Sequence, residues 1–217
     1  MKKFELTNEF VTNMFGTKLF RIRALVEFGD VEAGELGGYV EKESNLGHDD
    51  NAWVYGDARV YDNALVCGNA RVYGDAQVSG DARVYDNARV YGDAWVYGDA
   101  WVYGNALVCG NARVYDNARV YGDAWVYGNA RVCGDALVCG DARVCGNGDY
   151  AYAHGFGSVN RTTTFFRLKD GGVGVRCGCF YGTLAQFRDK IRETHGETKK
   201  AQEYLMLADL MKLRFEK

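Results

Sequence analysis

The sequence predicts a mainly β fold: a parallel β-solenoid followed by a small α+β region at the C-terminus. The first observation is a repeat, because residues 52–147 are sixteen uninterrupted copies of the unit Ala-x-Val-[Tyr/Cys/Ser]-[Gly/Asp]-[Asp/Asn]. The second is composition. The 217 residues include 28 Gly and no Pro, whereas average usage is about 7% Gly and about 5% Pro. The third is a change after residue 149, where hairpin and helix signals replace the repeat.

Each unit of the repeat predicts one short strand and one corner. Side chains alternate between the two faces of a strand, so the Ala and Val of Ala-x-Val-x share one face and the variable residues share the other. Gly, Asp and Asn at the last two positions tolerate the backbone of a tight turn. We therefore expect Ala and Val to fill the narrow interior of coils stacked about 4.8 Å apart.

The repeat, which begins with Ala52-Trp53-Val54-Tyr55-Gly56-Asp57, resembles the hexapeptide repeat of left-handed parallel β-helix proteins. This resemblance implies triangular coils of three units, or eighteen residues. Two further units around Tyr39 and Asn45 bring the expected total to about six coils. Residues eighteen apart then share a wall, and the outward positions form three columns: 53, 71, 89, 107, 125 and 143; 59, 77, 95, 113 and 131; 65, 83, 101, 119 and 137.

Three domains are predicted along the chain. Residues 1–37 form an N-terminal cap, residues 38–149 the left-handed β-helix, and residues 150–217 a hairpin and helical cap that also serves oligomerisation. Within the last domain, residues 162–169 and 173–180 flank Asp-Gly-Gly, a hairpin signal, and apolar spacing predicts helices over 183–194 and 197–215. The formal charge is −4 for residues 1–51, −3 for 52–147 and +4 for 148–217, so the basic part is the C-terminal cap.

The chain as a whole is similar to hexapeptide-repeat proteins of bacteriophage and prophage genomes. The shared features are GGYVE and NL at residues 37–46, the Ala-x-Val repeat, and a tail with RTTTFF, KDG and CGCFYGTL between residues 161 and 184. The resemblance implies a viral protein in the cytoplasm of a bacterial host. The sequence also lacks an apolar run of about 18 residues and a signal peptide, so we expect no membrane contact.

Charge and cysteine usage narrow the expected partners. A net charge of −3 and a pI near 5.7 predict no binding to genomic nucleic acid, since phosphate-backbone affinity depends on basic surface. Seven Cys without an export signal indicate free thiols in a reducing compartment. The cysteines at 133, 139 and 145 face three different walls, so no tetrahedral metal site is predicted, and no cofactor is expected.

The repeat offers little for catalysis. Many left-handed β-helix proteins are acyltransferases with a His general base, but the sixteen units contain no His and no inserted loop. Of His48, His154 and His195, His154 has the most suitable neighbours, because aromatic residues and Gly surround it. No catalytic residue is predicted, and an acyltransferase-type enzyme is the least favoured alternative.

The outer Arg and aromatic residues are the candidate ligand-binding groups. Arg83, Trp101 and Arg119 share a column. Arg can pair with phosphate and Trp can stack on a base, although cation–π packing accounts for the same column. The remaining candidates lie in the C-terminal domain: Tyr150, His154, Arg161, Arg167, Lys169 and Arg176.

Two functional classes follow from these groups. The sequence predicts a non-enzymatic, phage-encoded binding protein that sequesters a small anionic nucleotide-type immune signal. The alternative is a structural or protein-interaction solenoid, including one that is associated with the virion. Because large aromatic surfaces favour interfaces, we also expect a homo-oligomer, either a dimer or a trimer.

Overall fold

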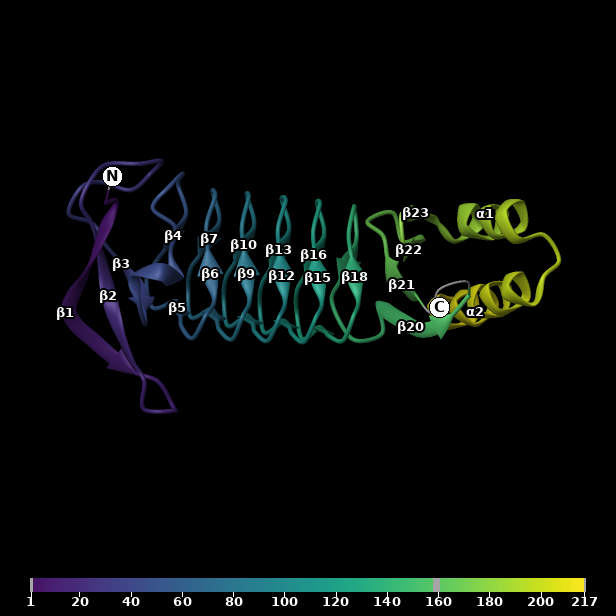
Figure 1. Ribbon diagram of the computed structural model, residues 1–217, viewed down its shortest axis with the longest axis horizontal. Coiled ribbons are helices and arrows are strands. Elements are labelled where there is room, and N and C mark those ends of the chain that lie inside the picture. The colour runs from purple at the N-terminus through teal and green to yellow at the C-terminus, as the bar shows by residue number, and fades with distance from the viewer. Residues whose placement is uncertain (1, 158–160, 217) are drawn as a thin grey trace.

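A computed structural model describes residues 2–157 and 161–216 as an elongated rod. Figure 1 shows the order of its parts: an antiparallel sheet at the N-terminal end, stacked coils in the middle, and a small sheet with two helices at the C-terminal end. The coils form three parallel sheets, each with about six levels. The predicted fold class, a parallel β-solenoid with an α+β C-terminal region, is confirmed.

The three walls of the solenoid consist of strands eighteen residues apart, as Trp101 paired with Arg83 and with Arg119 illustrates. Wall 1 contains β4 (Trp53–Val54), β7 (Arg71–Val72), β10 (Arg89–Val90), β13 (Leu107–Val108), β16 (Trp125–Val126) and β19 (Arg143–Val144). Wall 2 contains β3 (Leu36–Val40), β5 (Arg59–Val60), β8 (Gln77–Val78), β11 (Trp95–Val96), β14 (Arg113–Val114) and β17 (Arg131–Val132). Wall 3 contains β6 (Leu65–Val66), β9 (Arg83–Val84), β12 (Trp101–Val102), β15 (Arg119–Val120) and β18 (Leu137–Val138).

Every Ala and Val of the sixteen units is buried, with at most 1% of its surface exposed. The ladder between coils is regular: the amide of Trp101 donates to the carbonyl of Ala118 at 2.9 Å, and the amide of Tyr103 to that of Val120 at 3.0 Å. The strands are two residues long, such as Trp101–Val102, and thus shorter than the Ala-x-Val-x segment of each unit. The interior is therefore filled, and any binding surface lies outside it.

The backbone at the corners explains why the fifth residue of each unit is either Gly or Asp. The first corner residue has positive φ, 57° at Asp86 and 70° at Gly104. A Cβ at this position points towards the backbone amide of the next coil, as at Gly68, where it would lie 2.8 Å from the amide nitrogen of Asp86. Asp turns this approach into a hydrogen bond, since Oδ2 of Asp86 accepts from the amide of Gly104 at 3.1 Å. Asp62 and Asp116 make the same contact with the coil that follows them.

The N-terminal end of the solenoid is covered by a hairpin. Strands β1 (Phe4–Thr12) and β2 (Lys18–Ala24) are antiparallel, and β2 pairs with β3, which continues into wall 2. Phe4 and Phe28 pack edge-on against Trp53, which is fully buried although its column faces outward in later coils. Nζ of Lys3 donates to the carbonyl of Ala52 at 2.9 Å, so the first coil does not leave this acceptor unpaired.

The C-terminal region contains a four-stranded antiparallel sheet and two helices. The predicted hairpin is present as β21 (Arg161–Arg167) and β22 (Val173–Cys177), and β20 (Tyr150–Phe156) and β23 (Phe180–Thr183) extend it on both sides. Helix α1 (Leu184–His195) begins at the side-chain cap of Thr183, and α2 (Lys199–Phe215) at that of Thr198. Both helices lie within two residues of their predicted bounds.

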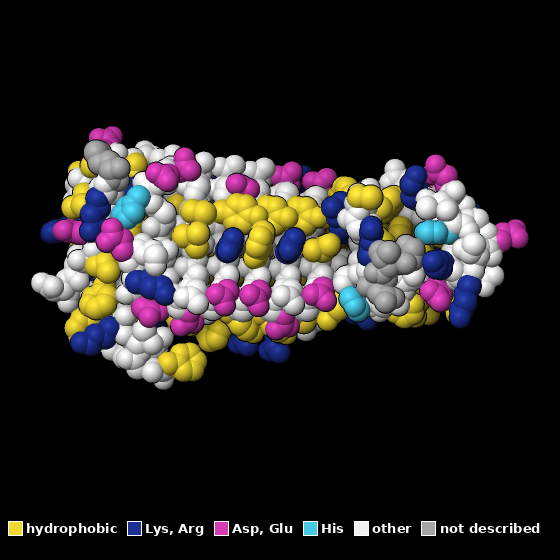
Figure 2. All heavy atoms as spheres, viewed as in Figure 1, with side chains coloured by type: hydrophobic (Ala, Val, Ile, Leu, Met, Phe, Trp, Pro, Cys, Tyr) yellow, Lys and Arg dark blue, Asp and Glu magenta, His cyan; other side chains and the backbone are white. Residues whose placement is uncertain are grey.

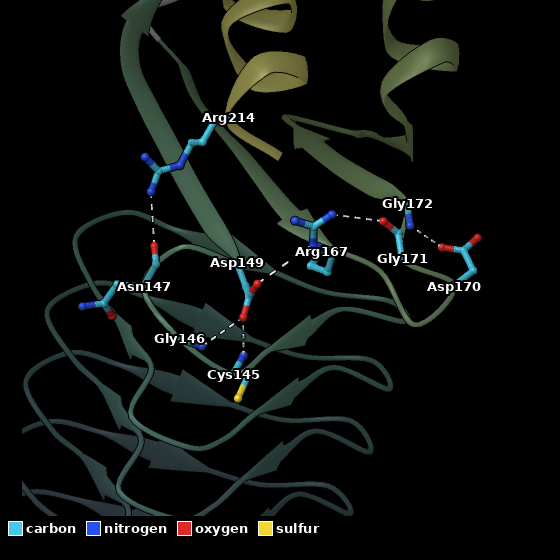
Figure 3. Close-up of polar contacts among 9 residues, drawn as sticks. All are labelled: Cys145, Gly146, Asn147, Asp149, Arg167, Asp170, Gly171, Gly172 and Arg214. Atoms are coloured by element: carbon cyan, nitrogen blue, oxygen red, sulfur yellow. Dashed lines mark hydrogen bonds and ion pairs between the residues drawn. The ribbon is translucent and has the colours of Figure 1, made fainter. Parts of the chain in front are cut away.

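Polar contacts join this region to the last coil (Figure 3). Oδ2 of Asp149 accepts from the amides of Cys145 and Gly146, both at 3.0 Å, and Arg214 of α2 donates to the carbonyl of Asn147 at 3.2 Å. The hydroxyl of Tyr150 donates to the carbonyl of Arg131 at 2.5 Å. The C-terminal region therefore satisfies acceptors and donors that the last coils would otherwise expose.

Candidate functional site

Wall 3 presents a ladder of cations and rings. The guanidinium carbons of Arg83 and Arg119 lie 5.2 and 4.8 Å from the ring centroid of Trp101, one on each neighbouring coil. Trp101 is half-buried, and both arginines are exposed. Neither arginine has a carboxylate within ion-pair distance among the described residues. The predicted column is thus a cation–π stack with two guanidinium groups free to meet an acidic group.

A column of tyrosines runs beside this stack. The rings of Tyr85, Tyr103 and Tyr121 are 4.9 Å apart from coil to coil, and their planes differ by 2° and 4°. Burial raises the pKa of Tyr103. Figure 2 shows this face as a continuous stripe of hydrophobic side chains with basic side chains set into it and a row of acidic side chains below. Together, the Arg83–Trp101–Arg119 stack and these tyrosines are named the wall 3 surface.

A groove of about 520 Å³ lies where wall 3 meets the C-terminal sheet. Its lining joins Arg119 of β15 to Arg161 of β21, and the other lining residues are Asn117, Asp135, Leu137, Thr162 and Gly178. His154 stands beside it, with Nδ1 3.0 Å from Oγ1 of Thr162 and 4.0 Å from Oδ2 of Asp135. This junction groove brings together three of the predicted residues, Arg119, Arg161 and His154, and the stack connects it to Trp101 and Arg83.

Three other predicted residues, Tyr150, Arg167 and Lys169, contact the last coils or other parts of the C-terminal region. The guanidinium of Arg167 lies 5.2 Å from the Phe215 ring centroid and donates to the carbonyl of Gly171 at 3.2 Å. Tyr150 is buried and, as described, bonds to the last coil. The amide of Lys169 donates to the carbonyl of Asp141 at 3.0 Å.

Arg176 holds an intermediate position. Its Nη1 donates to the carbonyl of Cys179 at 3.3 Å. Burial raises the pKa of Tyr121 at the end of the tyrosine column, and the nearby charge of Arg176 acts in the opposite direction. Arg176 therefore adjoins the wall 3 surface without lining the junction groove.

A smaller cavity of about 240 Å³ lies within the C-terminal region and was not anticipated from the sequence. Its apolar lining comes from Phe180, Phe187, Ile191 and Tyr204, which belong to β23, α1 and α2. The spacing of apolar residues predicted an apolar face on the first helix, but it did not indicate a cavity beside that face.

The described residues contain neither a metal-binding cluster nor a membrane-spanning helix. Within residues 2–157 and 161–216, no cluster of three or more His, Cys, Asp or Glu side chains is arranged to hold a metal ion. All seven cysteines are unpaired. No helix in the described part of the chain is both long and apolar enough to cross a bilayer.

The filled interior, the three parallel walls and the eighteen-residue register define a β-solenoid repeat protein. Comparison with protein-family models supports this class. Six segments of the solenoid match the model described as the YdcK beta solenoid repeat: residues 52–67, 64–80, 76–92, 82–98, 112–128 and 124–140. These matches lie wholly within the coils and include neither the N-terminal hairpin nor the C-terminal region. No curated protein matches the chain.

Proposed function

We propose that the protein is a non-enzymatic interaction solenoid that presents the wall 3 surface to a protein partner. The observation that carries this proposal is the Arg83–Trp101–Arg119 stack, whose guanidinium groups have no carboxylate partner among the described residues. Trp, Tyr and Arg contribute most of the binding energy in many interfaces. A rigid ladder also loses little conformational freedom on binding.

The charge pattern favours a protein over a nucleic acid. Asp81, Asp99 and Asp135 are exposed at the corner that precedes each wall 3 strand, and Figure 2 shows a row of acidic side chains below the hydrophobic stripe. A polyanion would meet repulsion from this row, whereas a protein can place acidic side chains on Arg83 and Arg119 and apolar ones on the rings. The partner expected is a protein with a mixed acidic and apolar surface.

The test compares two tryptophans on different walls. Trp101→Ala removes the centre of the wall 3 surface, and Trp125→Ala removes a wall 1 tryptophan that is 44% exposed and stacks with Arg143. Proteins that co-purify with the native chain are quantified for both variants, and circular dichroism verifies that each variant folds. A partner that is reduced at least tenfold by Trp101→Ala and retained by Trp125→Ala supports the proposal. Equal retention, or equal loss, contradicts it.

A second candidate function is binding of a small anionic nucleotide at the junction groove. It is favoured by the approach of Arg119 and Arg161 to one groove from two different parts of the fold. Guanidinium groups bind phosphate through paired hydrogen bonds. With the phage-like resemblance, this would make the protein a sponge for a nucleotide immune signal.

The second candidate is tested by thermal shift with cyclic dinucleotides and ADP-ribose derivatives. A ligand at one hundred times its dissociation constant stabilises the fold by about 2.7 kcal/mol. The shift should disappear in Arg161→Ala and persist in Arg89→Ala, an exposed arginine of wall 1. A melting temperature that is unchanged across the panel would exclude nucleotide binding.

A further inference from the structure

The cavity of the C-terminal region combines an apolar interior with a basic rim. Phe180, Phe187 and Ile191 line it, and the rings of Phe180 and Phe187 are 5.4 Å apart. This lining offers an apolar group a place away from water. Residues of the sheet, in β23, and of the first helix, α1, line the cavity together. The cavity therefore depends on the packing of the helices against the sheet.

Three basic side chains surround the interior. Arg161 comes from β21, and Lys190 and His195 come from α1. Lys190 already pairs with Glu193 at 2.9 Å, whereas Arg161 has no carboxylate within ion-pair distance among the described residues. His195 is the last residue of α1. No Asp or Glu is among the described residues that line the cavity.

We propose that this cavity binds a small organic acid that carries one aromatic ring or branched apolar group. The apolar group occupies the interior against Phe187 and Ile191, and the acid group meets Arg161 at the rim. The volume of about 240 Å³ exceeds the roughly 150 Å³ cavity that holds benzene in another protein. It therefore accommodates one ring with its acid group. A dinucleotide is too large, so this ligand differs from the one considered for the junction groove.

The cavity contains its own reporter. Cys179 lies in its lining and is exposed, so an alkylating reagent can reach the thiol. Cys177 also lines the cavity, but it accepts a hydrogen bond from Thr163 at 3.2 Å and is only partly exposed. Cys145, an exposed thiol at a corner of the last coil, serves as the matched control outside the cavity.

The first experiment measures the alkylation rates of Cys179 and Cys145 by mass spectrometry with four probes. Benzoate and phenyl phosphate carry the ring and the acid, benzyl alcohol carries the ring alone, and inorganic phosphate carries the acid alone. We expect one or both ring acids to slow alkylation of Cys179 and not of Cys145, with half-protection at a concentration at least tenfold lower than for the other probes. Equal protection by benzyl alcohol, equal protection of Cys145, or no protection would overturn the proposal.

Two variants test the assigned residues. Arg161→Gln removes the guanidinium group at the rim, and loss of a charge-assisted hydrogen bond should weaken binding about tenfold or more. Thr194→Trp places a large side chain at the lining and should abolish protection. Lys212→Gln on the exposed side of α2 is the control, and circular dichroism verifies folding. Unchanged protection in both cavity variants overturns the assignment. Neither variant changes the wall 3 surface, so the outcome is independent of the proposed protein partner. Arg161 also lines the junction groove, whereas Thr194 does not, so Thr194→Trp distinguishes the cavity from that groove.

Discussion

Replacing Val102 with Ala tests how the solenoid is stabilised. Val102 lies at the middle of the stack, is fully buried, and pairs with Val84 and Val120 on the coils either side. Truncation removes two methyl groups, and the lost transfer energy is about 1.6 kcal/mol at about 0.8 kcal/mol per group. The cavity left in an interior that cannot collapse adds about 1 kcal/mol. We therefore expect Val102→Ala to reduce the free energy of unfolding by about 2–3 kcal/mol.

The assay is urea denaturation followed by far-ultraviolet circular dichroism, with Arg89→Ala as the control. Arg89 is an exposed residue of β10 whose side chain faces outward from wall 1 rather than into the interior. Its truncation should change the free energy of unfolding by less than about 0.5 kcal/mol, as is usual for surface sites. A cost for Val102→Ala as small as that of the control would show that the valines do not lie in a packed interior.

Three further perturbations test the corners and the two ends. Asp86→Ala should destabilise the protein by about 1–2 kcal/mol, since it loses the bond to Gly104 at positive φ, whereas Asp86→Gly should cost less than half as much in the same thermal melts. Burial lowers the pKa of Lys3 to about 8; at this site the unfolded chain then binds more protons than the folded one, so the Lys3 contribution to stability should rise by at most about 2 kcal/mol from pH 7 to 9.5, measured in urea titrations as the change in the stability difference between the native chain and Lys3→Met. Tyr150→Phe loses the bond to the carbonyl of Arg131 and should lower stability by about 1 kcal/mol, with no change if the sheet is not docked on the last coil.

The solenoid was predictable because one physical requirement repeats in every coil. Ala and Val must face a narrow interior, so their recurrence fixed the inner face, and the resemblance to hexapeptide repeats supplied the eighteen-residue register that the strand pairs confirm. The role of the Asp at some corners could not be predicted from the repeat. Its carboxylate bonds to a glycine eighteen residues later, a relation that depends on the left-handed-region backbone at that corner and not on the repeat pattern itself.

The C-terminal region was predictable only where its signals are local. Asp170-Gly171-Gly172 located the hairpin and Thr183 the start of α1, but the strands at residues 150–156 and 180–183 depend on pairing with that hairpin. Arg167 and Tyr150 appeared as free polar groups in the sequence. They are instead engaged with Phe215 and with the last coil, through contacts that only the folded chain brings together.

Of the candidate sites, the stack on wall 3 could be predicted from the sequence, whereas the junction groove and the cavity could not. The Arg83–Trp101–Arg119 stack follows directly from the eighteen-residue register, and its cation–π distances agree with that register. The approach of Arg161 to Arg119, and the cavity behind Phe187, arise from how the C-terminal sheet docks on the solenoid and on its helices. No spacing along the chain encodes either arrangement.

The most direct test of the three-sided register is whether one introduced cysteine forms a disulfide with a native cysteine on a neighbouring coil. In Tyr127→Cys the new thiol lies between Cys109 and Cys145, one coil away on each side, because Leu107 pairs with Trp125 and Trp125 with Arg143. The coil spacing of about 4.8 Å lies within the Cα separation of disulfides. Oxidation and peptide mapping should show a bond from position 127 to Cys109 or Cys145, and none from position 97 to Cys109 in Tyr97→Cys. A bond over twelve residues in the second variant, with none over eighteen in the first, would contradict the fold.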